Sequence, residues 1–110
     1  MAQNSNTKPP KLTKADLESK LQSEIIRFLR SLGCIVWKLQ QNATTERARP
    51  DIFFLKEGFW GGIEVKKSKT SRFQPGQKQM VEKLDSWSWC KVVYRETWPE
   101  IKRELSQLLK

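Results

Sequence analysis

The chain has 110 residues, and its 21 basic and 12 acidic side chains give a formal net charge of +9. A chain of this length is expected to form one domain, and its positive charge favours a polyanionic partner, most often nucleic acid. Because the sequence contains no histidine, it excludes a Ser-His-Asp triad, an HNH-type nuclease site and any zinc site built on histidine.

The apolar runs are all shorter than the roughly 18 residues that a membrane span needs. We therefore expect no signal peptide and no membrane segment, and we expect the protein to work in the cytoplasm (of the host, if a phage encodes it). Cys34 and Cys90 have no neighbours at metal-ligand spacing. They are interpreted as small buried hydrophobic residues in a reducing compartment.

The chain is expected to begin with a disordered basic arm over residues 1–12, followed by a single domain over residues 13–110. Thr13 and Asp16 have the spacing of a capping box, which predicts the start of a helix. Gly33 is expected just after the end of this helix. Apolar residues recur along it at helical spacing: Leu17, Leu21, Ile25, Phe28, Leu29 and Leu32.

Strand and helix signals alternate in the rest of the sequence. Strands are expected over 34–39, 51–55, 61–66 and 90–94, with a polar loop over 40–49 and a basic loop over 67–72. Pro75 predicts the first turn of a second helix, whose core-facing side is expected to carry Gln77, Met80, Val81, Leu84 and Trp87. Thr97 and Glu100 predict another capping box and a final helix through Leu109. The predicted order is α-β-β-β-α-β-α, an α/β fold with a mixed sheet flanked by helices.

The two strands on either side of Glu57-Gly58 are expected to pair as a hairpin. A turn centred there places Asp51 directly opposite Glu64 on one face of the sheet, and the period of two puts Lys66 on that face as well. Two opposed carboxylates repel each other, whereas a hard divalent cation prefers clustered carboxylate oxygens. The hairpin therefore predicts a metal site with a lysine beside it.

Each of these residues also has a simpler interpretation. An Asp after a Pro is often part of a turn, and Glu64 could be a solvated strand residue. Glu18 lies close to the apolar side of the first helix, where a carboxylate needs a charged partner or a metal. That partner could be Lys14 or a lysine of the hairpin. A buried Gln77 needs hydrogen-bond partners, which the surroundings of Lys66 or a water could supply, or it could simply brace the sheet.

In their order along the chain, these residues resemble the PD-(D/E)xK nuclease superfamily, and more closely the stand-alone VRR-NUC domains (virus-type replication-repair nucleases) of phages. The resemblance covers about residues 17–94. It rests on Glu18-x-x-x-Gln22 in the first helix, Gly33 at its end, Arg49-Pro50-Asp51, Glu64-x-Lys66, and Gln77 in the next helix. The loop before Arg49 differs, since many relatives have glycines where this chain has Ala43-Thr44-Thr45-Glu46.

The resemblance implies a metal-dependent endonuclease that cuts branched DNA such as a Holliday junction, commonly as a homodimer, without an organic cofactor. Asp51, Glu64 and the Val65 carbonyl would bind Mg²⁺ or Mn²⁺, and Glu18 would be a further ligand directly or through water. Lys66 would orient or deprotonate the attacking water, and Gln77 would position Lys66 or that water. Basic residues near the site are expected to contact the DNA backbone: Arg47, Arg49, Lys67, Lys69, Arg72 and Lys78.

Two other functions remain possible at this point. The first is a module with the same fold that binds a DNA or RNA junction without cutting it. The second is a basic accessory protein that binds other proteins through exposed tryptophans, because five tryptophans cannot all be buried in so small a chain.

Overall fold

The computed structural model describes residues 13–39 and 49–110, and it confirms the predicted order of the elements. The arm over residues 1–12 lies outside the described residues. The elements are α1 (Lys14–Ser31), β1 (Ile35–Lys38), β2 (Ile52–Lys56), β3 (Phe59–Val65), α2 (Gln77–Trp87), β4 (Cys90–Val93) and α3 (Trp98–Leu108). None of these described helices is long and apolar enough to cross a membrane.

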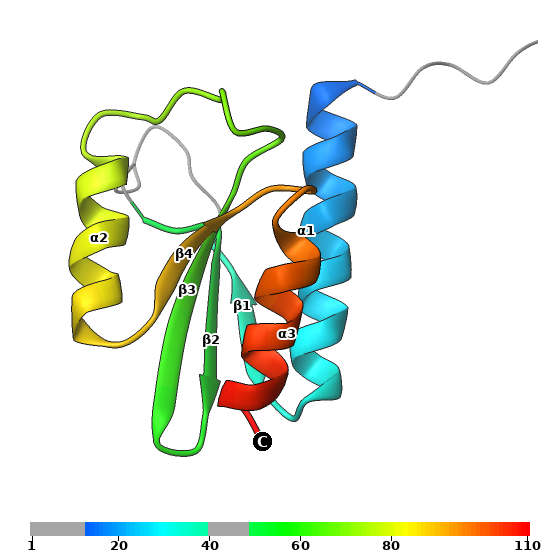
Figure 1. Ribbon diagram of the computed structural model, residues 1–110, viewed down its shortest axis with the longest axis vertical. Coiled ribbons are helices and arrows are strands. Elements are labelled where there is room, and N and C mark those ends of the chain that lie inside the picture. The colour runs from blue at the N-terminus through cyan, green and yellow to red at the C-terminus, as the bar shows by residue number, and fades with distance from the viewer. Residues whose placement is uncertain (1–12, 40–48) are drawn as a thin grey trace, which may run out of the picture.

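The four strands form one mixed sheet in the order β1-β2-β3-β4. β2 pairs antiparallel with both β1 and β3, whereas β4 pairs parallel with β3, and α2 connects these two strands. Figure 1 shows α1 and α3 side by side against one face of the sheet and α2 on the other side, next to β3 and β4. The fold is therefore the predicted α/β sheet flanked by helices.

The hydrophobic core lies between the sheet and the pair formed by α1 and α3. Leu21, Ile25 and Leu29 provide the buried stripe of α1, as the helical spacing predicted. They pack with inward-facing side chains of all four strands and of α3, which include Val36, Ile52, Phe54, Ile63, Val65, Val93, Trp98 and Leu105. Burial of this apolar surface fixes the sheet against the two helices, and the polar site described below is built on the opposite face.

The β2–β3 hairpin has the predicted register. Ile52 pairs with Ile63, so that Asp51 and Glu64 follow as the next opposed positions. Gly58 forms the turn with φ of +77°, a conformation that favours glycine. Gly61 is required for a different reason. A Cβ atom there would lie 2.4 Å from Cζ of Phe54, so the phenyl ring packs directly on the glycine backbone.

Both ends of α1 are capped as the sequence predicted, but the start of α3 is not. Thr13 and Asp16 form the predicted capping box, and Gly33 follows the helix with φ of +88°. At α3 the capping box predicted for Thr97 and Glu100 is wrong. Thr97 makes no side-chain cap bond; its hydroxyl instead donates to the carbonyl of Tyr94 and accepts from the N–H of the same residue. The Thr97 hydroxyl is therefore bonded to the turn that begins at Tyr94 and is not available to cap α3.

Three further details differ from the sequence-based expectation. Pro75 lies just before α2, because Gly76 in a left-handed conformation is the N-cap and the helix begins at Gln77. Leu17 and Trp87 belong to the apolar stripes of their helices, yet they are 49% and 66% exposed. Each lies near a helix end where no described element covers it.

Candidate active site

Two carboxyl groups meet where β2 begins and β3 ends. Asp51 comes directly before β2, and one of its oxygens accepts a hydrogen bond of 2.7 Å from the backbone N–H of Val65. Glu64 lies opposite, near the end of β3, with only 3% of its surface exposed. The hairpin register, which is set by the turn at Gly58, therefore brings the two acids together as predicted.

Burial makes the ionised form of both acids unfavourable. Burial, together with the charge of Asp51, raises the pKa of Glu64 to about 8, and the Lys66 ammonium limits this rise. Burial also raises the pKa of Asp51, although the hydrogen bond from Val65 partly offsets the effect. Near neutral pH, therefore, the pair tends to hold a proton in place of a second negative charge. A cation bound between the acids would stabilise both carboxylates in their ionised form, so that the pair would no longer favour a proton.

The Lys66 side chain is buried beside this pair and is held by three oxygen atoms. Its Nζ donates to Oε1 of Gln77 at 2.9 Å and to the carbonyl of Arg72 at 3.1 Å, and it lies 3.4 Å from Oε2 of Glu64. The ring of Phe73 lies 5.0 Å from the same nitrogen, within the range of a cation–π contact. The ammonium is thus fixed in direction before any substrate arrives.

Gln77 is the residue that links Lys66 to the second helix. It is 2% exposed in the first turn of α2. Its Oε1 accepts from the backbone N–H of Gln74 at 3.0 Å as well as from Lys66. Because the Gln77 carbonyl oxygen is already committed to two donors, it can hold the lysine in one position. Of the alternatives that the sequence left open for Gln77, the structure thus shows the one in which its hydrogen-bond partner is Lys66.

Glu18 reaches the same place from α1. It is half-buried, and burial raises its pKa, with a further increase from the charge of Asp51. Lys66 and a backbone hydrogen bond from Lys67 act in the opposite direction. Glu18 therefore lies close enough to interact electrostatically with the acidic pair, and its assignment as a metal ligand stays a prediction.

These residues line one small polar cavity of about 220 Å³, whose walls are Glu18, Leu39, Asp51, Glu64, Val65, Lys66, Gln74 and Gln77. Oε1 of Glu64 is buried and has no hydrogen-bond partner among the described residues. A buried carboxylate oxygen without a partner is unfavourable unless a cation or water binds it. The donor set is all oxygen, as Mg²⁺ or Mn²⁺ prefers.

Within residues 13–39 and 49–110, no three acidic, cysteine or histidine side chains converge closely enough to bind a metal as a group. The acidic pair and the Val65 carbonyl therefore remain the most direct candidate ligands. Glu18 lines the same cavity, so it remains a candidate ligand, directly or through water.

The basic residues that are predicted to contact DNA differ in how exposed they are to solvent. Lys69, Arg72 and Lys78 are exposed in the loop after β3 and in the first turn of α2, whereas Arg49 and Lys67 are half-buried. Arg47 lies outside the described residues. Lys69 and Arg72 lie between Lys66 and Gln77 in the chain, and Lys78 directly follows Gln77, so all three are close to the site in sequence.

The sequence analysis did not identify the groups in the loop between β3 and α2 that contact Lys66 and Gln77. The carbonyl of Arg72, the ring of Phe73 and the backbone N–H of Gln74 all take part. A backbone group has no signature in the sequence, and an exposed Phe in a loop has several ordinary explanations. The separation of eleven residues between Lys66 and Gln77 indicated that a loop connects them, but not which groups of that loop contact the lysine.

Comparisons with known proteins support the fold. A solved structure described as a "VRR_NUC domain" superposes with a TM-score of 0.62 and 23% sequence identity, covering 82% of this chain and 94% of that chain. No protein-family profile matches the sequence, and no curated protein matches it. The chain therefore has the fold of that domain, as its sequence pattern predicted.

Proposed function

We propose that this chain, which has the fold of a VRR_NUC domain, is a metal-dependent endonuclease that hydrolyses phosphodiester bonds in DNA. The observation that carries the proposal is the contact between Glu64, Lys66 and Gln77 beside Asp51 in one polar cavity. Paired acids and a fixed cation are what the hydrolysis of a phosphate ester needs, since negative charge develops on oxygen. The positive charge of the chain suits the substrate.

Asp51, Glu64 and the Val65 carbonyl would hold Mg²⁺ or Mn²⁺, with Glu18 as a ligand through water. The ion supplies a bound water of lowered pKa and neutralises charge on the phosphate. The orphan oxygen of Glu64 supports this assignment, because ion binding would satisfy it.

Lys66 would act on the substrate side of the same cavity. Its ammonium can donate to the attacking water or to a phosphate oxygen while it keeps its bonds to Gln77 and the Arg72 carbonyl. Such a fixed donor lowers the barrier because it needs no reorientation when the charge develops. In this proposal Gln77 is a positioning residue, because it acts through Lys66.

The proposed substrate is branched DNA, such as a Holliday junction, and cleavage would leave a 5′-phosphate. Arg47, Arg49, Lys67, Lys69, Arg72 and Lys78 are proposed to contact the sugar–phosphate backbone. Contacts of this kind position the nucleic acid without reading its sequence, so recognition would depend on the shape of the DNA.

The test is cleavage of labelled four-way junction, flap, nicked and linear duplex DNA in Mg²⁺, Mn²⁺ or EDTA. Lys66→Ala should abolish cutting and keep DNA binding. The matched control, Lys102→Ala, removes an exposed lysine from α3 on the other side of the sheet and should cut normally.

Cutting by Lys66→Ala, or cutting in EDTA, would refute the site assignment. Binding of junctions without cutting in any metal would instead identify a non-catalytic junction-binding module.

A further inference from the structure

Phe73 is a large apolar side chain in the basic loop between β3 and α2. The centre of its ring lies 5.0 Å from Nζ of Lys66, and yet 37% of the residue is exposed. Lys66 itself is buried, so the ring covers the ammonium with one part of its surface and leaves another part open to solvent. The next residue, Gln74, lines the polar cavity. Phe73 therefore lies at the edge of the candidate site.

The backbone on both sides of Phe73 is bonded to the site. The carbonyl of Arg72 accepts from Nζ of Lys66 at 3.1 Å, and the N–H of Gln74 donates to Oε1 of Gln77 at 3.0 Å. Lys66 and Gln77 are in turn bonded to each other at 2.9 Å. These bonds fix the main chain before and after Phe73. A ring that is held in this way loses little conformational freedom when a ligand packs on it.

The ring is also close to the position that the proposed function gives to the scissile phosphate. Nζ of Lys66, which the ring covers, lies 3.4 Å from Oε2 of Glu64. A phosphate held there brings its own sugar and base within reach of Phe73. Exposed cations lie nearby in the sequence and can pair with neighbouring phosphates: Lys69, Arg72 and Lys78. An aromatic ring among cations is the combination on which the bases of single strands stack.

We infer that Phe73 determines substrate specificity by stacking on a base that has a free face, next to the phosphate that is cut. The inference rests on the proposed nuclease function and names the feature of DNA that its site selects. Within a continuous duplex, each base is stacked on both sides and offers no face to Phe73. At a branch point, a flap or a nick, a base can offer one. Because every base has such a face, this contact selects DNA by structure and not by sequence.

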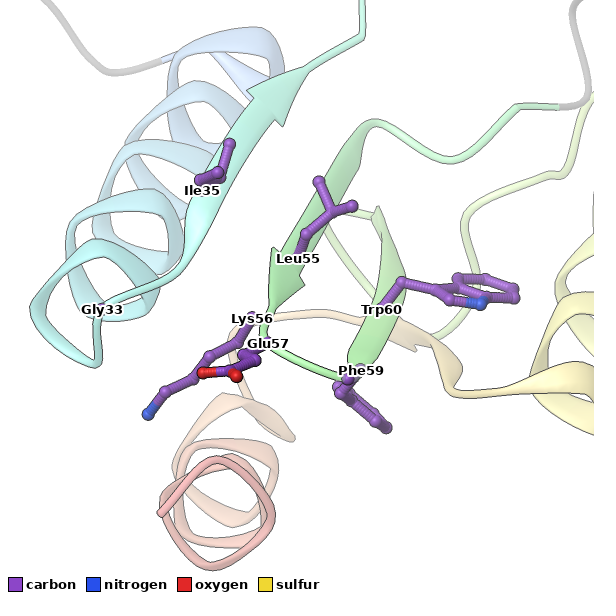
Figure 2. Close-up of a pocket in the computed structure, with 8 residues that line it drawn as sticks. Gly33, Ile35, Leu55, Lys56, Glu57, Phe59 and Trp60 are labelled. Atoms are coloured by element: carbon purple, nitrogen blue, oxygen red, sulfur yellow. The ribbon is translucent and has the colours of Figure 1, made fainter.

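Aromatic side chains at the other end of the hairpin lack these neighbours. Figure 2 shows Phe59 and Trp60 beside a hollow of about 450 Å³ at the turn between β2 and β3. The lysine that lines this hollow, Lys56, donates to the carbonyl of Leu109. The acidic site lies at the opposite ends of the same two strands. Phe59 is therefore a suitable control residue, since its ring lies away from the site.

The experiment is equilibrium binding of the full chain to a labelled four-way junction, measured by fluorescence anisotropy in EDTA so that it does not depend on cutting. One base at a time is removed from the nucleotides next to the branch point. For the wild type, loss of the stacked base should weaken binding about tenfold, within the range for one base on one aromatic ring. Loss of a base in the middle of a duplex arm should leave binding unchanged.

Phe73→Leu should weaken binding of the intact junction about tenfold, because leucine can still cover Lys66 but has no ring for a base to stack on. Removal of the base should then cause no further loss. Phe73→Trp should restore both the affinity and the sensitivity to the missing base, which a purely structural role of Phe73 would not do. Phe59→Leu makes the same change at the hairpin end and should bind as the wild type does. Circular dichroism checks that each variant is folded.

A wild-type chain that is insensitive to every base next to the branch point would overturn the inference. So would an equal loss from the missing base in the wild type and in a folded Phe73→Leu variant. The scan of the wild type needs no variant, so it tests the inference even if Phe73→Leu does not fold.

Failure of the inference and failure of the proposed function give different results. Metal-dependent cutting with no sensitivity to any of these bases would keep the nuclease and overturn the role of Phe73. Sensitivity to one base that depends on Phe73, with no cutting in any metal, would support the stacking contact and overturn the nuclease.

Discussion

Replacing Gln77 with leucine should destabilise the protein because it removes an acceptor that a buried ammonium and a partly buried backbone N–H share. Oε1 of Gln77 accepts from Nζ of Lys66 at 2.9 Å and from the N–H of Gln74 at 3.0 Å. A hydrogen bond to a charged group contributes about 1.5–3 kcal/mol and a neutral one about 0.5–1.5 kcal/mol. The free energy of unfolding should therefore fall by roughly 2–4 kcal/mol, since both donors lose a partner in a buried place.

The measurement is urea unfolding, followed by the fluorescence of the five tryptophans. Gln79→Leu is the matched control, because Gln79 is exposed on the same helix and should change stability by less than about 0.5 kcal/mol. A double-mutant cycle with Lys66→Met isolates the pair, and its coupling energy should be about 1.5–3 kcal/mol, the range of a charged hydrogen bond.

A coupling energy below about 0.5 kcal/mol is within the error of additive sites and would refute the reasoning. So would equal effects of Gln77→Leu and Gln79→Leu. In the cleavage assay, Gln77→Leu should bind DNA normally but cut more slowly, because the ammonium of Lys66 is no longer fixed.

Three more predictions concern the acids and the hairpin. Glu64→Gln should weaken Mn²⁺ binding at least tenfold in calorimetry, and unchanged affinity would place the metal elsewhere. Because burial raises the folded-state pKa of Glu64 from 4.5 to about 8, its protonated form stabilises the fold below pH 4.5, and this contribution is lost as the pH rises through 8. In EDTA, the urea midpoint should thus fall between pH 5 and 9, and this fall should be smaller in Glu64→Gln; equal slopes would contradict the assignment. Gly61→Ala should cost roughly 1–3 kcal/mol by overpacking against Phe54, whereas Gly58→Ala, whose Cβ would meet nothing within 4 Å, should cost about 1–2 kcal/mol through its left-handed φ alone; a Gly61→Ala variant as stable as the wild type in urea unfolding would count against this packing.

The loop between β3 and α2 connects the parts of the candidate site. Its Arg72 carbonyl and Phe73 ring contact Lys66, and its Gln74 N–H is bonded to Gln77. Within the same loop, Ser68 and Ser71 bond to each other through backbone and side chain, which keeps the turn closed. The cations proposed to contact the DNA backbone and the groups that hold Lys66 therefore come from one segment, so changes in this loop should affect DNA binding and turnover together in the proposed nuclease.

The sequence by itself determined the order of the elements and the pairing of Asp51 with Glu64. Strand periodicity and a glycine turn are local properties, so one register follows from them, and that register places two carboxylates face to face. Helical spacing also placed Gln77 on the buried side of α2, where it must find a hydrogen-bond partner.

Only the tertiary structure decided which groups surround Lys66 and which apolar residues stay exposed. The Arg72 carbonyl and Glu18 reach the site because a loop and a helix fold over it, and contacts between distant segments depend on the whole packed core. Similarly, an apolar stripe shows which side of a helix avoids water, but another element must be there to cover it. Trp87 and Leu17 belong to such stripes and remain exposed, because no described element packs over them.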